Sequence, residues 1–389
     1  MSLWKRRKDN KDTIKTNGII QENPEECIKL VEQGFLKDVF LKDSVTDLSY
    51  NGEKFYALDN DIGRYRLNIE ISSDEVLTFI KKISNYMLQP FSNKHSSLDV
   101  SFGNYRLNAL HPSLARNDNK KVVTFSLRKI TATLKIKDND TYLCPIDVHY
   151  FLKCLMKSYQ SVLISGQTGS GKTEFQKYLI SLMNATDRII MIEESYETHV
   201  KEIFKDMDIT TWIVNNSTDE LSYLVKNALR NNPDWLIVAE TRGKEAYEMI
   251  QAVMTGHSAI TTLHTESAKF SIARLTNMCK KSVEFDEKNM LSNIASHIKI
   301  GIHLEKIYDE LKGRYIRRIS EIIEYIPKEN GYEINPIFEI NKDENLNEKL
   351  IYRPISESLK KEFIKHNIQI KTLGKFIKEV KKSEKKKGK

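Results

Sequence analysis

The stretch Gly166-Gln-Thr-Gly-Ser-Gly-Lys172-Thr173 fits the pattern G-x-x-x-x-G-K-[ST] at every defined position. The apolar run at 161–165 predicts a buried strand before it. Apolar residues at helical spacing predict a helix from Thr173 onward. Glycines let the backbone turn so that several N–H groups face phosphate oxygens, and a helix N-terminus adds its positive dipole end. The stretch therefore predicts a phosphate-binding loop for a nucleoside triphosphate.

Each residue type in this loop has an expected task. Lys172 can reach the β- and γ-phosphates as a point charge, and the Thr173 hydroxyl can ligate Mg²⁺. ATP and Mg²⁺ are therefore the expected cofactors. The residues expected to contact the nucleotide are Gly166, Gln167, Thr168, Gly169, Ser170, Gly171, Lys172, Thr173 and Glu174.

Length and composition limit the class of protein. A chain of 389 residues accommodates two domains plus tails, and no apolar run approaches the ~20 residues of a membrane-spanning helix. The N-terminus is basic but lacks the apolar core of a signal peptide, so we expect a cytoplasmic protein. The four cysteines are scattered, which favours reduced thiols over a zinc site or disulfides.

The net charge of +8 is concentrated in the C-terminal tail, where residues 371–389 contain nine lysines and two glutamates. This distribution does not support a body that coats nucleic acid, and we expect no direct nucleic-acid binding. Two interpretations of the basic ends stay open. They are candidates for contact with acidic lipids or a partner, and they are equally typical of solvated, disordered termini.

The patterning predicts two domains of different class. A basic segment and a helix at Cys27–Leu41 occupy residues 1–40, and a smaller α+β domain follows at 41–130. Beyond a linker at 131–144, alternating helices and apolar strands predict an α/β domain with a mostly parallel sheet. That RecA-like domain is expected at 145–340, before a Lys-rich extension at 341–389.

Particular elements follow from local signals. Ser72 and Glu75 predict a helix start, as do Ser217 and Glu220, and Asn51-Gly52 predicts a hairpin turn. The strands expected in the second domain lie at 161–165, 189–192, 235–239, 259–263, 296–304 and 315–325.

Three of these strands end in reactive side chains. The second ends at Glu193-Glu194, the third at Glu240-Thr-Arg242 and the fourth at His264. Ligands of parallel α/β sheets bind at the carboxyl ends of the strands, where acids can hold Mg²⁺ or orient a water molecule. His257, which precedes the fourth strand, is a weaker candidate for the same site.

Four segments in this order resemble the Walker A, Asp, Walker B and His boxes of the hexameric traffic ATPases of type II and type IV secretion. Within that superfamily the chain is most similar to the CpaF-like ATPases of tight-adherence pili and conjugative type IV secretion. Segments 45–52 and 105–112 resemble the N-terminal motifs of that branch, and 331–339 its C-terminal signature. The four boxes are 166–173, 192–197, 227–243 and 255–264.

The resemblance implies roles for individual residues. Glu193 would orient or deprotonate the attacking water, and Glu240 would bind Mg²⁺ together with Thr173. His264 would link the phosphate end of the site to neighbouring elements. Arg106 and Arg128 match arginines that reach the γ-phosphate, where a bidentate donor suits developing charge.

The resemblance also implies a function and partners. It implies a homo-hexameric ATPase motor at the inner face of the cell membrane, working with inner-membrane platform or secretion-channel proteins. Glu194 departs from the Asp usual in the family, and the paired-cysteine zinc subdomain of the type II branch is missing. The alternatives are a nucleic-acid-translocating, helicase-like ATPase and a structural scaffold that only binds ATP. An ABC transporter subunit is disfavoured because the chain has no L-S-G-G-Q segment.

Overall fold

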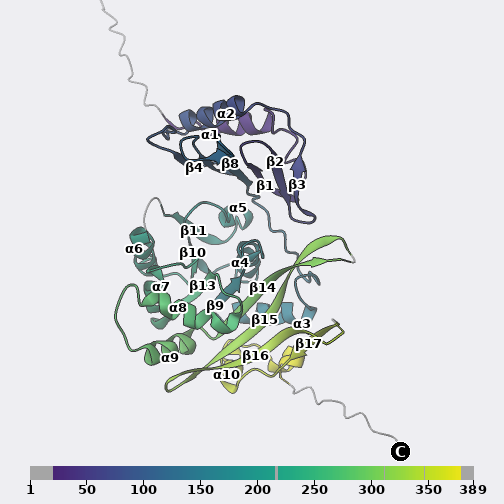
Figure 1. Ribbon diagram of the computed structural model, residues 1–389. Helices are drawn as coiled ribbons and strands as arrows, with labels where there is room; N and C mark the ends of the chain where they lie inside the picture. The colour runs from purple at the N-terminus through teal and green to yellow at the C-terminus, as the bar shows by residue number, and fades with distance from the viewer. Residues whose placement is uncertain (1–20, 215–217, 311, 346, 378–389) are drawn as a thin grey trace, which may run out of the picture. The chain divides into compact units, whose positions relative to one another are not determined.

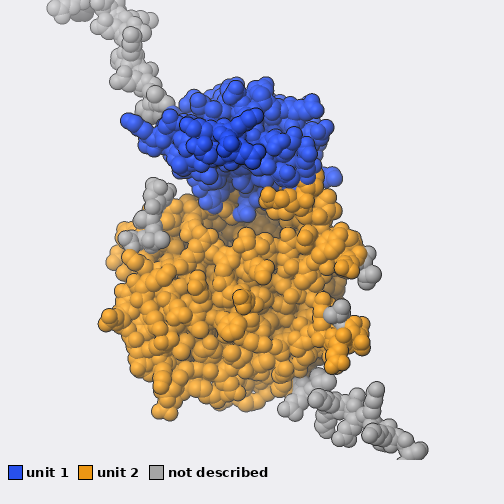
Figure 2. Space-filling view, viewed as in Figure 1, with its two compact units in different colours: residues 1–57, 66–128 blue, residues 58–65, 129–389 orange. Residues whose placement is uncertain are grey.

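The computed structural model describes residues 21–377 apart from 215–217, 311 and 346 (Figure 1). The chain divides into two compact units, which Figure 2 shows in different colours. Unit 1 comprises residues 1–57 and 66–128, and unit 2 comprises 58–65 and 129–389. The domain boundary expected at 130 lies two residues beyond the last residue of unit 1, and residues 58–65, expected in the first domain, are counted with unit 2.

Unit 1 is an α+β structure that contains most of a six-stranded sheet; residues 58–59, 63–65 and 129 of these strands are counted with unit 2. Helices α1 (Pro24–Glu32) and α2 (Ser73–Tyr86) contact each other beside this sheet. A small separate ribbon pairs β6 (Arg116–Asn117) with β7 (Lys120–Lys121). The order of the six strands is β3 (Gly63–Leu67), β2 (Phe55–Asp59), β1 (Val45–Tyr50), β8 (Thr124–Lys129), β5 (Tyr105–Leu110) and β4 (Ser97–Phe102).

Two local predictions in unit 1 have different outcomes. The start of α2 is confirmed: Ser72 and Glu75 form a reciprocal capping box. The helix expected at Cys27–Leu41 is too long, because α1 ends at Glu32 and turns follow. Asn23 caps α1 from outside the expected range, and Phe35 packs against Phe55 and Phe79 from a turn. Phe35 has the spacing of a buried helical residue in the sequence, but it is buried by aromatic packing from a turn.

Unit 2 is an α/β structure around a nine-stranded sheet (Figure 1). The pairs from β11 to β14 are parallel, and those from β14 to β17 are antiparallel. The predicted fold class is confirmed. The strand order is β11 (Asp208–Ile213), β10 (Arg188–Glu193), β12 (Trp235–Val238), β13 (Ser258–Leu263), β9 (Val162–Gly166), β14 (Ile300–Asp309), β15 (Arg314–Lys328), β16 (Gly331–Lys342) and β17 (Glu348–Tyr352).

The expected strands β9, β10, β12, β13 and β15 are all present. The strand expected at 296–304 is wrong at its start, because α9 (Glu287–His297) continues to His297. Asp286 caps this helix, which takes in Ser296 and His297 and ends at the extended residue Ile298, so the strand β14 begins only at Ile300. Ser217, the first residue of the other predicted capping box, lies outside the described residues; α6 runs over Thr218–Leu229.

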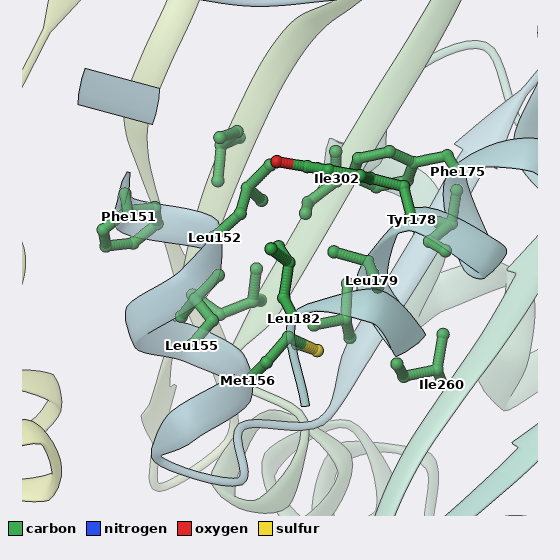
Figure 3. Packing of buried hydrophobic residues seen from close by; sticks show 14 of the residues in the cluster. Phe151, Leu152, Leu155, Met156, Phe175, Tyr178, Leu179, Leu182, Ile260 and Ile302 are labelled. Atoms are coloured by element: carbon green, nitrogen blue, oxygen red, sulfur yellow. The ribbon is translucent and has the colours of Figure 1, made fainter. Parts of the chain in front are cut away.

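Two layers of helices cover the sheet of unit 2. On one face, α3 (Ile146–Lys157) and α4 (Lys172–Ser181) pack their apolar side chains together over Ile260 and Ile302 (Figure 3). The other face is covered by α6, α7 (Glu245–Met254), α8 (Ser271–Cys279) and α9. Neighbouring residues of β9 serve opposite layers, Leu163 one and Ile164 the other. Strand β9 is thus buried on both faces, as is usual for a strand inside a parallel sheet.

The cysteines and the lengths of the helices can be followed in the described part of the chain. Its cysteines are free and buried, and burial raises the pKa of Cys154 to about 11. None of its helices is both long and apolar enough to cross a bilayer.

Residues 343–377 complete the core of unit 2. Helix α10 (Glu357–Lys365) and the 3₁₀ segment η2 (Ile370–Phe376) follow β17 and pack on α3. Phe376 is fully buried, and its ring stacks on Phe151 at 4.5 Å between centroids. Phe363 meets the same ring edge-on at 6.0 Å. Phe363 and Phe376 thus attach this segment to the core. Its polar composition gave no sign of that position in the sequence.

We expect Phe376→Ala to lower the free energy of unfolding by about 3–5 kcal/mol, because it removes a fully buried ring from a packed cluster. Urea unfolding followed by circular dichroism measures this effect. Ile364→Ala is the matched control, since Ile364 in the same segment is 59% exposed and should change stability by no more than about 0.5 kcal/mol. Equal effects of the two substitutions would show that the segment is not part of the core.

Candidate functional site

The phosphate loop connects β9 to α4, and three glycines shape it. Gly166, Gly169 and Gly171 all have positive φ values, of 150°, 78° and 91°. A Cβ at Gly166 would lie 2.5 Å from both the Leu304 carbonyl oxygen and Ser170 Oγ. Only glycine satisfies this turn. Gly171 is the N-cap of α4, so the loop ends where the helix N-terminus begins.

The Lys172 ammonium lies against its own loop. Nζ donates to the carbonyl oxygens of Gly166, at 2.7 Å, and Gln167, at 3.1 Å. Burial lowers the pKa of Lys172, the Glu240 charge opposes this shift, and the Arg242 charge adds to it. The ammonium is therefore a partly desolvated cation, which strengthens its attraction for an anion.

The loop also fits a phosphate group by its unpaired polar atoms. Ser170 Oγ is buried without a hydrogen-bond partner among the described residues. A buried hydroxyl of this kind carries a desolvation cost that a bound ligand can relieve. Thr173 is exposed in the first turn of α4, next to Lys172. The donor set fits a triphosphate, and the Thr173 hydroxyl is an oxygen ligand of the kind that Mg²⁺ prefers.

The parallel sheet brings the ends of β12 and β13 to this loop. Glu240 follows β12 by two residues, and His264 follows β13 directly. His264 Nε2 is 3.2 Å from Glu240 Oε1, and His264 Nδ1 is 3.4 Å from Lys172 Nζ. Three residues predicted from separate segments therefore meet in one chain of contacts: Lys172, His264 and Glu240.

The charges in this chain of contacts shift one another. Burial opposes ionisation of Glu240, but Arg242 outweighs it with help from His264 and Lys172, so the pKa of Glu240 is lowered. Burial and then the Lys172 charge lower the pKa of His264, against the pull of Glu240. The site thus holds an ionised carboxylate beside an imidazole that resists protonation.

Glu193 occupies a different environment at the end of β10. Its side chain is buried and accepts three hydrogen bonds: from Glu197 N at 3.2 Å, Thr198 N at 2.9 Å and Thr198 Oγ1 at 2.7 Å. Burial nevertheless dominates and raises the pKa of Glu193. The pKa of Glu193 is therefore raised, whereas the pKa of Glu240 is lowered. Two carboxylates whose pKa values shift in opposite directions are typical of a site with separate acid–base roles.

Arg242 was not assigned a role from the sequence, although the motif contains it. Its guanidinium forks onto Glu240, with Nε 2.6 Å from Oε1 and Nη2 2.8 Å from Oε2. Nη1 reaches Glu194 Oε2 at 2.9 Å. Glu194 stands where the family usually has Asp, and its longer side chain contacts this arginine.

Other loop contacts stabilise the phosphate loop from outside. Glu174, expected near the nucleotide, instead accepts from the Lys135 backbone N–H and pairs with Lys177 Nζ at 2.7 Å. Lys177 in turn donates to the Thr133 carbonyl oxygen at 2.8 Å. Arg317 Nε donates to the Gly169 carbonyl oxygen at 2.9 Å. No sequence motif marked Arg317, because its strand lies far along the chain.

Three remaining candidates lie elsewhere. His257 precedes β13, and His264 follows it. One strand length, about 20 Å, therefore separates the two histidines. The expectation that His257 approaches the site is wrong within unit 2. Arg106 and Arg128 lie in unit 1, on β5 and β8. They pair with Asp99 at 3.4 Å and Asp47 at 3.0 Å. Their contact with a nucleotide stays a prediction.

Comparison with known proteins places these features in a family. The family model described as Type II/IV secretion system protein matches residues 104–309, more than half of the chain. An uncharacterized protein of Bacillus anthracis is 35% identical over 293 residues, covering 75% of this chain and 65% of that protein. The chain thus spans less than two thirds of that relative.

Two further comparisons agree. The type IV secretion system protein PtlH of Bordetella pertussis is 33% identical over 133 residues, which are 33% of this chain and 39% of that protein. The solved structure of the Yersinia pseudotuberculosis ATPase DotB shares the fold, with a TM-score of 0.59 at 15% identity over 78% of this chain and 80% of that one. With its phosphate loop and converging strand ends, this chain belongs to the type II/IV secretion system protein family.

Proposed function

We propose that this chain hydrolyses ATP with Mg²⁺ and uses the reaction to drive a type IV secretion, conjugation or pilus-assembly machine. The observation that carries the proposal is the convergence of Lys172, Glu240 and His264 at one edge of the parallel sheet. The relatives' names agree, since one is a type IV secretion system protein and another an ATPase. No contact among the described residues favours the helicase-like alternative.

The residues would divide the work as follows. The backbone N–H groups of the loop and Lys172 would bind and orient the phosphates, and Thr173 and Glu240 would hold Mg²⁺. The metal would neutralise charge on the phosphate oxygens. Glu193, with its raised pKa, would accept a proton from water if the Thr198 hydroxyl rotates away and frees Oε1. His264 would hold the side chains of Glu240 and Lys172 in position relative to each other.

The assembly is part of the same proposal. We propose a homo-hexamer at the inner face of the cell membrane, in contact with inner-membrane platform or channel proteins, because the family resemblance implies it. Most of the basic ends, which are the candidates for acidic-lipid contact, lie outside the described residues, although Lys371 and Lys375 belong to η2. Changes of subunit shape during the ATP cycle would do the mechanical work.

We expect Lys172→Ala to reduce ATP turnover at least about a hundredfold, because the phosphates lose their principal charge partner. The fold and the hexamer should persist, because the Lys172 ammonium bonds to loop carbonyl oxygens and His264 among the described residues. Steady-state turnover, thermal melting and mass by light scattering test this together. Lys226→Ala, at a side chain 61% exposed, is the control. Turnover retained in Lys172→Ala would contradict the proposed site.

Substitution by glutamine separates the two carboxylates. Glu193→Gln should bind Mg²⁺-ATP about as well as the wild type yet hydrolyse it at least about tenfold more slowly, because only proton acceptance is lost. Glu240→Gln should also raise the Mg²⁺ concentration needed for half-maximal binding. Fluorescent-nucleotide binding across an Mg²⁺ titration measures both effects. The reverse pattern would exchange the two roles, and unchanged turnover in both variants would remove them.

We further propose that Arg106 and Arg128 recognise the γ-phosphate. Ala at either position should leave ADP affinity nearly unchanged and slow hydrolysis at least about tenfold, because only the triphosphate carries their target. Lys should restore little, since a point charge cannot replace a planar fork. Arg116→Ala, at an exposed arginine of the same unit, is the control. Normal turnover in both Ala variants would make these arginines surface residues only.

A further inference from the structure

Arg242 occupies the carboxylate that the proposed function assigns to Mg²⁺. Both oxygens of Glu240 are engaged, Oε1 by Arg242 Nε and His264 Nε2 and Oε2 by Arg242 Nη2. A forked arginine–carboxylate pair is the strongest geometry available to two such side chains. A metal ion, or the water molecules around it, needs these same oxygen lone pairs. Arg242 and His264 already use three of the roughly four acceptor sites of this carboxylate, so a cation and the guanidinium compete for Glu240.

The backbone of Arg242 is held by hydrogen bonds to a buried acid, whereas its side chain is more than half exposed. Glu245, only 1% exposed, accepts from Arg242 N at 2.5 Å and Gly243 N at 2.8 Å and so fixes the turn. The Arg242 side chain is 59% exposed and its partner Glu240 only 20%, so the guanidinium borders solvent while the carboxylate stays within the site. A role in folding alone is therefore a weak explanation for the two hydrogen bonds between Arg242 and Glu240.

A second acid gives the guanidinium somewhere else to bind. Glu194, at the end of β10, already holds Nη1 at 2.9 Å, and the charge of Glu197 also attracts Arg242. If the two contacts to Glu240 break, the contact to Glu194 keeps the guanidinium at the edge of the site. The longer side chain of Glu compared with Asp extends this reach.

We propose that Arg242 competes with Mg²⁺ for Glu240 and is displaced onto Glu194 when the metal-nucleotide complex binds. Arg242 is thereby a positioning residue that sets how much Mg²⁺ the site requires, and Glu194 is its receiving partner. This inference rests on the assignment of Glu240 to Mg²⁺.

Two substitutions in one cluster should act in opposite directions. Arg242→Gln removes the competitor and should lower the half-saturating Mg²⁺ concentration about threefold, the scale of an exposed ion pair. Glu194→Gln removes the receiving partner and should raise it by a similar factor. The readout is binding of a slowly hydrolysed fluorescent ATP analogue during an Mg²⁺ titration. Lys226→Gln, which removes a positive charge that is paired with Glu248 and not with Glu240 or Glu194, should change nothing.

The outcomes separate this inference from the proposed function. If Glu240→Gln leaves the Mg²⁺ requirement unchanged, the assignment of Glu240 fails. If Glu240→Gln raises it but Arg242→Gln does not lower it, competition by Arg242 fails. A higher Mg²⁺ requirement in Arg242→Gln would show that the arginine assists the metal-nucleotide complex instead. Should Arg242→Gln unfold, Arg242→Lys keeps the charge, loses the fork and should shift the requirement in the same direction.

Discussion

The central constraint of unit 2 is the pairing of β9 with parallel neighbours on both edges. β13 pairs with it on one side and β14 on the other, and every residue of the strand is buried. Gly166, its last residue, pairs with Leu304, whose carbonyl leaves no space for a Cβ. The phosphate loop therefore starts from a point that the sheet holds rigidly. Rigid support of this kind pre-organises a site before any ligand arrives.

The charges at that edge form one coupled group. Lys172 contacts His264, His264 contacts Glu240, and Glu240 holds Arg242. Removing one member changes the surroundings of the others, so the effects of substitutions in this group will not be additive. The contrast with Glu193 is instructive: a buried carboxylate with neutral donors has a raised pKa, whereas one beside an arginine has a lowered pKa.

The antiparallel half of the sheet and the C-terminal helix complete the support of the site. Strands β15 to β17 extend the sheet beyond β14, and Arg317 on β15 donates to the Gly169 carbonyl oxygen at 2.9 Å. Phe363 and Phe376 cover α3, which packs on the helix that follows the phosphate loop. Segments more than 140 residues apart along the chain thus stabilise one loop.

The sequence by itself determined the fold class and most strands, because hydrophobic periodicity and the spacing of Gly166, Gly171 and Lys172 are local properties. It also placed Glu240 and His264 at strand ends, where the parallel order brings them together. Only the tertiary structure decided that Arg242 forks onto Glu240 and that Phe376 belongs to the core. Side-chain partners and burial depend on non-local packing, which a local pattern does not encode.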